Sequence, residues 1–315
     1  MNLNDAAMVR GTHDSLEDER NASVLIYVNG VMTPRDEAKI SVFDSGYLVG
    51  DGVWEGVRFK QGVFVFLEEH INRLFEGARM IFMDIGETFE SLKGKLTETI
   101  EANGMTDGIH VRLMVTRGNK KTPSQDPRLT ITPPNIVIIP EYKTANPDVR
   151  KSGVRLYTSA IRRGSPDYLD PRLNCHSKLH EVVALSQAIG AGADEALMLD
   201  INGFVSTCNA TNFFIVRSGE VWTSTGKYCM NGVTRGKVLA VSELGGIPAV
   251  QKDFSLVDVY SADEAFVTGT FGGITPVSEI DGRPVAKGSY PGPMTQRLID
   301  LYDQEVGAYI AKATA

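Results

Sequence analysis

The stretch Asp170-Pro171-Arg172-Leu173-Asn174-Cys175-His176-Ser177-Lys178 decides how the rest of the chain is interpreted. Its last four residues carry a thiol, an imidazole, a hydroxyl and an amine, and the run 179–189 that follows contains neither Gly nor Pro. Ionisable side chains where an extended segment gives way to a helix are typical of functional sites. The first question is therefore whether Lys178 is a catalytic amine or a surface lysine.

Composition and charge exclude several classes of protein. The chain has 315 residues, of which 42% are hydrophobic and 23% charged, and a formal net charge of −7. An acidic chain lacks the basic face that phosphate backbones require, so we expect no nucleic acid as a main partner. No apolar run approaches the roughly 20 residues that span a bilayer, and we expect no membrane partner.

The three cysteines, Cys175, Cys208 and Cys229, are far apart in the sequence. Such a sparse, odd set is typical of free thiols in a reducing compartment. No His or Cys cluster has zinc-site spacing, so we expect no metal. With no apolar core of signal-peptide length in the first 22 residues, we expect a cytoplasmic protein.

The pattern of apolar residues predicts an α+β chain in two unequal halves. We expect an N-terminal arm over 1–23, a small α/β domain over 24–143, a polar linker over 144–153 and a larger domain over 154–315. Apolar residues at helical spacing and runs of alternating residues predict the elements. The predicted helices are 68–83, 88–103, 179–190, 234–244 and 293–311, and the predicted strands include 24–29, 40–43, 54–59, 108–117, 135–140, 154–161, 195–200, 204–207, 212–216, 220–223 and 264–268.

Three stretches have features of anion sites. Gly232-Val233-Thr234-Arg235 places a glycine turn and a hydroxyl at the start of a helix, where backbone N–H groups favour phosphate. The glycine-rich turn 269–273 follows a strand and can form a nest of N–H groups. Arg73 lies on the first long helix, three residues after His70. Since no nucleotide-binding glycine motif accompanies them, these stretches together indicate a small phosphorylated cofactor.

Six motifs in order make the sequence recognisable: GDGVWEGVRF (50–59), FLEEHINRL (66–74), VTRG (115–118), NATNFFIV (209–216), GVTR (232–235) and GTFGGITPV (269–277). Over about residues 24–302 the chain resembles the class IV pyridoxal-phosphate aminotransferases, a family with branched-chain and D-amino-acid aminotransferases among its members. The resemblance implies the fold type IV architecture, with a small N-terminal α/β domain and a larger C-terminal pseudo-barrel domain. It also implies a homodimer with pyridoxal 5′-phosphate as cofactor.

The resemblance assigns site residues as well. The cofactor's phosphate would bind Arg73, the backbone at Val233 and Thr234, the Thr234 hydroxyl, and Thr270. A substrate carboxylate would bind Arg112 or Arg117, because a guanidinium fork suits a carboxylate. Trp54 and Phe271 would narrow the pocket, and Tyr47, His176 and Cys175 are further lining candidates.

Two positions depart from the family pattern. The position of the usual Schiff-base lysine falls on Asn174, and the position of the glutamate that pairs with the pyridine nitrogen falls on Thr207. Asparagine cannot bond covalently to the cofactor. Lys178 is the displaced candidate: over an extended segment its Cα would lie roughly 13 Å from that of residue 174, but over a helical one only about 6 Å along the axis. A threonine hydroxyl can donate to an unprotonated ring nitrogen, which weakens the ring as an electron sink.

These observations leave three readings open. The first is an aminotransferase that moves an amino group between a small amino acid or amine and a 2-keto acid, with Lys178 as the catalytic amine. The second is a lyase or racemase of the same fold, which the threonine at 207 motivates. The third is a degenerate member of the family that binds the cofactor without a covalent bond, which Asn174 motivates.

Overall fold

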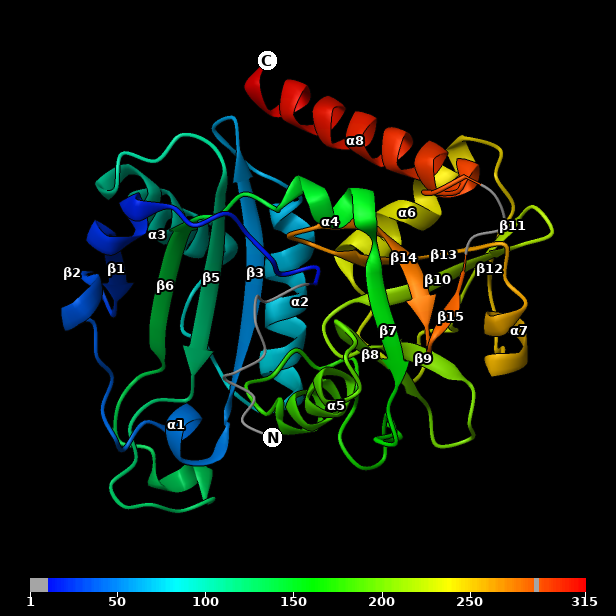
Figure 1. The fold of residues 1–315 in the computed structure, drawn as a ribbon. Coiled ribbons are helices and arrows are strands. Elements are labelled where there is room, and N and C mark those ends of the chain that lie inside the picture. The colour runs from blue at the N-terminus through cyan, green and yellow to red at the C-terminus, as the bar shows by residue number, and fades with distance from the viewer. Residues whose placement is uncertain (1–10, 286–288) are drawn as a thin grey trace. The chain divides into compact units, whose positions relative to one another are not determined.

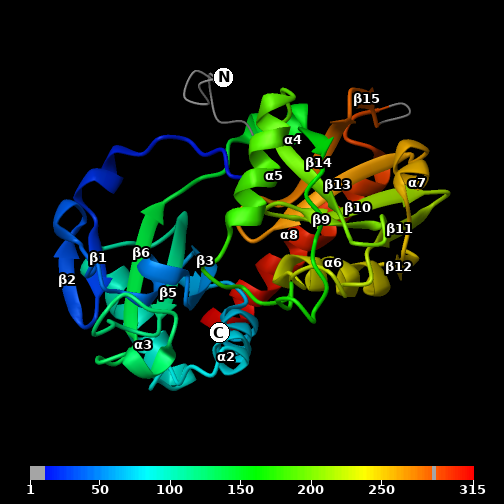
Figure 2. The ribbon, with the colours of Figure 1, turned by 90° about the horizontal axis from the view of Figure 1, so that it is seen from below.

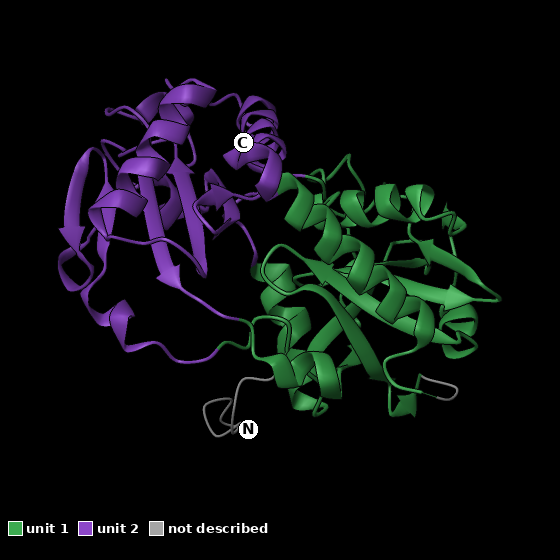
Figure 3. Cartoon of the chain, turned by 90° about the horizontal axis from the view of Figure 1, so that it is seen from above, with its two compact units in different colours: residues 1–15, 145–172, 179–309 green, residues 16–144, 173–178, 310–315 purple. Residues whose placement is uncertain are grey.

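In the computed structural model, residues 11–285 and 289–315 are described, and the first ten residues of the predicted N-terminal arm lie outside them. The chain forms two compact units (Figure 3). Of the described residues, unit 1 comprises 11–15, 145–172, 179–285 and 289–309, and unit 2 comprises 16–144, 173–178 and 310–315. The stretch 170–178 is thus divided between the two units: residues 170–172 belong to unit 1, and residues 173–178 belong to unit 2.

Unit 2 is built on a six-stranded sheet in the order β2-β1-β6-β5-β3-β4, in which every pairing is antiparallel. Its strands are β1 (Leu25–Val28), β2 (Val31–Pro34), β3 (Gly52–Lys60), β4 (Val63–Phe64), β5 (Ile109–Thr116) and β6 (Asn135–Tyr142). Helices α2 (Leu67–Met80) and α3 (Phe89–Ala102) both cover one face of this sheet (Figures 1 and 2). The short elements are η2 (Glu19–Ser23), η3 (Arg35–Glu37), α1 (Ser45–Val49) and η4 (Pro127–Leu129).

Strand β5 shows how the sequence divides the two faces of this sheet. Its residues alternate, so Ile109, Val111, Leu113 and Val115 all join the core under the helices. The residues between them, among them Arg112 and Met114, point to the opposite face, where they line a pocket. One alternating strand therefore supplies both the core of unit 2 and part of a cavity wall.

A buried ion cluster joins β3 to α2. The carboxylate of Glu55 is fully buried and accepts hydrogen bonds from Arg73 Nε and Nη2, each 2.7 Å, while His70 Nδ1 lies 2.7 Å from it. Burial alone would raise the pKa of Glu55, but the charge of Arg73 and the hydrogen bonds from His70 and Arg73 outweigh it and lower the pKa to about 2. The cluster fixes Arg73 on its helix.

Unit 1 contains a nine-stranded mixed sheet in the order β12-β11-β10-β13-β14-β7-β8-β9, with β15 paired to β14. Its strands are β7 (Val154–Thr158), β8 (Glu195–Leu199), β9 (Val205–Cys208), β10 (Asn212–Arg217), β11 (Glu220–Thr223), β12 (Ala249–Gln251), β13 (Glu264–Gly269), β14 (Gly273–Ile280) and β15 (Arg283–Pro284). Strand β8 is buried throughout because both of its faces are covered. Ala196 and Met198 pack with Ala184 and Ala188 of α5, whereas Leu197 and Leu199 join the main core of the unit.

The helices of this part of the chain are α4 (Pro147–Ser152), α5 (Leu179–Gly190), α6 (Val233–Leu244), α7 (Leu256–Tyr260) and α8 (Pro293–Thr314). The last of these, α8, runs into the final residues, which cluster with unit 2. None of the helices in the described ranges is both long and apolar enough to cross a membrane.

Some predicted elements differ from the structure. Residues 40–43 are not a strand, and the glycine-containing segment after them forms the helix α1. Strand β14 was not predicted, because its apolar residues directly follow glycines that indicated only a turn. Within the predicted linker, Pro147–Ser152 is helical, and the chain returns to unit 1 at residue 145.

The Glu55 cluster predicts the pH dependence of stability. Because the pKa of Glu55 is lowered on folding, its contribution is complete above the unfolded value of 4.5 and is lost as the pH falls towards about 2. Glu55→Gln should lower the free energy of unfolding at pH 7 by about 3 kcal/mol. Between pH 4.5 and 2 the variant should lose less stability than the wild type.

Chemical denaturation at pH 7, 4 and 3 measures both effects. The control is Glu98→Gln, which changes an exposed glutamate on α3. Equal losses of stability on acidification in wild type and Glu55→Gln would contradict the role given to the carboxylate.

Candidate active site

The segment 173–178 is held against the start of β3 by strand-like pairing. Trp54 N donates to the Asn174 carbonyl (3.1 Å), His176 N donates to the Gly52 carbonyl (3.0 Å), and Cys175 forms an isolated antiparallel bridge with Val53. The thiol of Cys175 is buried in the core of unit 2 and does not line the pocket. The segment is therefore fixed in register with β3 at Asn174 and Cys175, and it bends at His176.

Two glycines, Gly50 just before β3 and Gly52 at its first position, make this close approach possible. A Cβ on Gly52 would lie 2.6 Å from the Val115 carbonyl and 3.1 Å from the His176 ring. A Cβ on Gly50 would lie 2.3 Å from Ser177 Oγ, and Gly50 also has a φ of +71°. Gly50 and Gly52 thus leave room for the side chains of His176 and Ser177.

Asn174, the residue predicted to replace the family's covalent lysine, has a side chain of which only the amide nitrogen is hydrogen-bonded among the described residues. Its Nδ2 donates to the Trp54 carbonyl at 2.6 Å, and the residue is 5% exposed. Its Oδ1 is buried, and no donor among the described residues bonds to it. An orphaned buried acceptor costs about 1–3 kcal/mol, which a ligand donor can recover.

Lys178 lies outside the helix, because α5 begins at Leu179. The early helix start that would bring Lys178 close to position 174 along the backbone is therefore not observed. Its side chain nevertheless turns back to β3, where Nζ lies 5.9 Å from the centre of the Trp54 ring. The amine thus faces the same residue whose peptide group pairs with Asn174.

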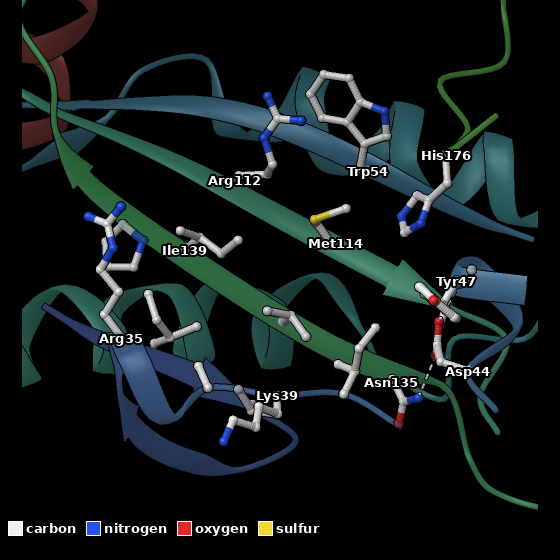
Figure 4. A pocket seen from close by; sticks show the side chains of 18 of the residues that line it. Arg35, Lys39, Asp44, Tyr47, Trp54, Arg112, Met114, Asn135, Ile139 and His176 are labelled. Carbon is white, nitrogen blue, oxygen red and sulfur yellow. Dashed lines mark hydrogen bonds between the residues drawn. The ribbon is translucent and has the colours of Figure 1, made fainter. Parts of the chain in front are cut away.

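A pocket of about 660 Å³ lies on the open face of the unit 2 sheet (Figure 4). Trp54, Arg112, Lys178, Tyr47 and His176 all contribute to its lining, as the sequence suggested for several of them. The Arg112 guanidinium lies 4.2 Å from the centre of the Trp54 ring, an attractive cation–π arrangement. The pocket therefore combines a basic, aromatic wall with an apolar floor, which is formed by Met114, Val137 and Ile139.

The ionisation of the pocket residues follows from their burial. Burial lowers the pKa of His176, against the raising effect of the Val53 carbonyl that its Nε2 contacts at 3.2 Å. The imidazole is therefore neutral at pH 7. Burial also lowers the pKa of Arg112, and Glu141 partly offsets this, but the guanidinium remains charged.

Arg117 has a different environment from Arg112. Its Nε and Nη2 donate to the Asp51 carboxylate at 2.7 and 3.0 Å, and it also donates to the carbonyls of Ile81 and Phe82. Arg117 does not line the pocket. These contacts give it a structural role in unit 2 and lend no support to the prediction that it binds a substrate carboxylate.

The predicted phosphate residues of unit 1 lie at two turns. Gly232 is the N-cap of the twelve-residue helix α6, and no side chain caps the helix. The N–H groups of Val233 and Thr234 and the buried Thr234 hydroxyl thus form a donor set suited to a phosphate. Thr270 lies at the tip of the β13–β14 hairpin, where Gly269 pairs with Gly273.

The remaining cofactor and substrate candidates also have defined environments. The Thr207 hydroxyl donates to the Thr211 carbonyl at 2.7 Å, so its proton is already used within unit 1 and an oxygen lone pair remains as acceptor. Phe271 belongs to unit 1 and stacks near His13, with ring centres 6.4 Å apart. Arg73 belongs to unit 2, so its contribution to a phosphate held at α6 stays a prediction.

A pyridoxal-phosphate group fits these residues in part. Helix α6 offers a phosphate site, whereas Asn174 offers no amine for covalent attachment. No group of three or more His, Cys, Asp or Glu side chains in the described ranges is placed to hold a metal ion.

Sequence reasoning missed two carboxylates, Glu55 and Asp44. Glu55 positions Arg73, and Asp44 accepts hydrogen bonds from Tyr47 N and Asn135 Nδ2 at one end of the pocket (Figure 4). The signal for Glu55 was its place within the otherwise uncharged run 52–57 of β3, where a charged residue needs a buried partner.

Comparison with known proteins identifies the family. Residues 52–280 match the class IV amino-transferase family. The chain is 39% identical to a putative branched-chain-amino-acid aminotransferase of Methanocaldococcus jannaschii, over 88% of this chain and 94% of that protein. It is 32% identical to a D-alanine aminotransferase of Listeria monocytogenes, over 89% and 96%. It is 37% identical to branched-chain-amino-acid aminotransferase-like protein 2 of Arabidopsis thaliana, but spans about half (51%) of that relative's length.

Solved structures agree with this result. A branched-chain amino acid aminotransferase with pyridoxamine 5′-phosphate superposes with a TM-score of 0.85 at 29% identity, covering 91% of this chain and 95% of that one. The Thermoproteus uzoniensis branched-chain aminotransferase with norvaline gives 0.81 at 29% identity, covering 90% and 95%. The predicted α+β architecture of fold type IV is confirmed. The cofactor of this family is pyridoxal 5′-phosphate, and the chain belongs to the class IV aminotransferases.

Proposed function

We propose that this protein moves an amino group between a small amino acid or amine and a 2-keto acid, with pyridoxal 5′-phosphate as cofactor. The family match over residues 52–280 carries the proposal. When bound, the cofactor supplies an aldehyde for the amino group and an electron-withdrawing ring. The residues of this chain would bind and orient the reactants and move protons.

The N-terminus of α6 would hold the phosphate through the N–H groups of Val233 and Thr234 and the Thr234 hydroxyl. Thr270 and Arg73 are the further phosphate ligands in this proposal. Thr207 would lie beside the ring nitrogen as a hydrogen-bond acceptor, because its proton is bonded to the Thr211 carbonyl. Arg112 would bind a substrate carboxylate, and it is supported by its place in the pocket wall beside Trp54.

Lys178 is the proposed catalytic amine. It lines the same pocket as Arg112, and its Nζ lies over the Trp54 ring. Neutral His176 lines this pocket too and would keep the neighbouring wall free of additional charge. In this arrangement Lys178 would exchange a proton with the substrate carbon, while Trp54 and the apolar floor exclude water.

The role of Lys178 predicts a labelling result. Borohydride treatment of the protein loaded with pyridoxal phosphate should fix the cofactor on the peptide that contains Lys178, as mass spectrometry of a digest can show. Lys178→Met should abolish the label and lower the transamination rate at least about 100-fold, since it removes a general base. Lys93→Met, an exposed change on α3, serves as the control. Label that persists in Lys178→Met would exclude Lys178 as the attachment site.

A second candidate function is non-covalent binding of the cofactor in its amine form. The orphaned Oδ1 of Asn174 favours it, because a primary amine can donate the hydrogen bond that this acceptor lacks in the described residues. A family member of this kind would bind the cofactor but would not attach it to a lysine.

This candidate predicts a preference between two forms of the cofactor. Pyridoxamine phosphate should bind about tenfold more tightly than pyridoxal phosphate, which corresponds to one net hydrogen bond of about 1.4 kcal/mol. Asn174→Leu should remove the preference, and Asn174→Asp, which retains an acceptor, should preserve it. Isothermal titration calorimetry measures each affinity. Equal affinities in the wild type would rule this candidate out.

A further inference from the structure

We propose that residues 11–13 are part of the cofactor site of unit 1. In this arrangement the 11–13 segment covers the glycine-rich turn 269–273 and, through the buried carboxylate of Glu195, keeps Thr270 and Thr207 in the positions that bind the cofactor. The inference rests on the cofactor roles proposed above for these two threonines. It deepens them, since the family match over residues 52–280 does not reach the segment.

The 11–13 segment packs against the turn between β13 and β14. A Cβ on Gly272 would lie 3.3 Å from the Thr12 carbonyl oxygen, a closer approach than most Cβ atoms make. Beside this contact the His13 ring stacks on that of Phe271, with 8° between the ring planes. Phe271 and Gly272 directly follow Thr270. The segment therefore touches the turn at the residues next to the predicted phosphate ligand.

The same segment is bonded to a buried carboxylate. The Thr12 N–H donates to Glu195 Oε1 at 3.3 Å, and the Thr12 hydroxyl donates to the same oxygen. Glu195 is the first residue of β8, and within the described residues no lysine, arginine or histidine pairs with it. Burial raises the pKa of Glu195, and the hydrogen bonds from Thr12 and Thr211 act in the opposite direction. Because a buried carboxylate needs donors, this contact holds Thr12 in place.

The second oxygen of this carboxylate connects to the other end of the turn. Thr211 Oγ1 donates to Glu195 Oε2 at 2.7 Å. The Thr211 methyl group lies 3.4 Å from the place that a Cβ on Gly269 would take, so it supports the first residue of the turn. The Thr211 carbonyl also accepts the hydrogen bond from Thr207. Glu195 thus links Thr12 to Thr207 and to the turn.

These links give the segment an influence on cofactor affinity. A site whose binding residues are in position only part of the time has an apparent affinity reduced by that fraction. Because Thr12 supplies two of the hydrogen bonds to Glu195, loss of its hydroxyl loosens the support of the turn and of Thr211 together. Since linked equilibria are reciprocal, the bound cofactor stabilises the segment in turn.

Fluorescence titration of the full chain with pyridoxal phosphate tests the proposal. Thr12→Val should raise the dissociation constant about tenfold, because the fraction of protein with the turn in place falls by that factor. Thr12→Ser retains the hydroxyl and should keep the wild-type affinity. A dissociation constant that is unchanged in Thr12→Val would overturn the proposal.

Thr158→Val is the matched control. Thr158 also belongs to unit 1, and its N–H and hydroxyl donate to one carboxylate, that of Asp281, at 2.6 Å each. This pair lies at the end of β14 that is remote from the turn. The change removes the same kind of hydrogen bond and should leave the dissociation constant as in the wild type. An equal rise in Thr158→Val and Thr12→Val would mean a general loss of stability and contradict the proposal.

Hydrogen exchange followed by mass spectrometry gives a second readout. The N–H groups of Thr12 and Asp14 are bonded to Glu195 and to the Gly11 carbonyl, so their exchange reports whether the segment is in place. Pyridoxal phosphate should slow this exchange in the wild type and in Thr12→Ser, and less in Thr12→Val. Exchange that does not respond to the cofactor in the wild type would also refute the inference.

The outcomes separate this inference from the proposed amino-group transfer. Transamination by the wild type, together with an unchanged dissociation constant in Thr12→Val, refutes the role of the segment alone. Slower exchange of the segment with bound cofactor, but no turnover of any amino acid, refutes the amino-group transfer alone. A wild type that binds no pyridoxal phosphate overturns both.

Discussion

The pairing of residues 174–176 with the first residues of β3 is the interaction on which the rest of the site depends. Two backbone hydrogen bonds and the Asn174 amide hold the segment in register with Gly52 and Trp54. Each is worth only about 1 kcal/mol net, but together they determine which side chains face the pocket and which enter the core. They also hold the chain outside the helix up to Lys178, and α5 begins at Leu179.

The backbone part of this pairing does not depend on the side chain at residue 174. The bond from Trp54 N to the Asn174 carbonyl is made by main-chain atoms, so either an asparagine or the lysine that the resemblance predicts here is compatible with it. The cost of the asparagine is an unsatisfied oxygen, buried beside the aromatic wall. The amine nearest in sequence is Lys178, whose side chain returns to the same tryptophan. An amine therefore lies near Trp54 although residue 174 is an asparagine.

The sequence predicted the parts of the fold that local rules determine. Helices α2, α3, α5 and α6 and most of the strands follow from residue spacing and agree with the structure within a few residues. Residues 40–43 contain three apolar side chains, as a short strand would, but do not form a strand, and Ile40 lines the pocket. Such differences arise because pairing partners far along the chain decide whether an apolar segment becomes a strand.

The candidate site was predictable in its residue types but not in its contacts. Arg112 and Arg117 are both arginines on or next to one strand, and the sequence gives no reason to separate them. Only the structure shows that Asp51 engages Arg117 while Arg112 lies beside the pocket. Likewise, the proton of Thr207 is bonded to a carbonyl four residues further along the chain, a contact that requires the turn between β9 and β10.

The alternation of β5 has a consequence for how this protein can change over evolutionary time. Substitutions at Val111, Leu113 and Val115 change the packing of the core. Substitutions at Arg112 and Met114 change the surface that a ligand in the pocket contacts. Selection for a new ligand can therefore act on every second residue of the strand with little penalty in folding. Divergent specificity within a common architecture is the expected outcome of such a division.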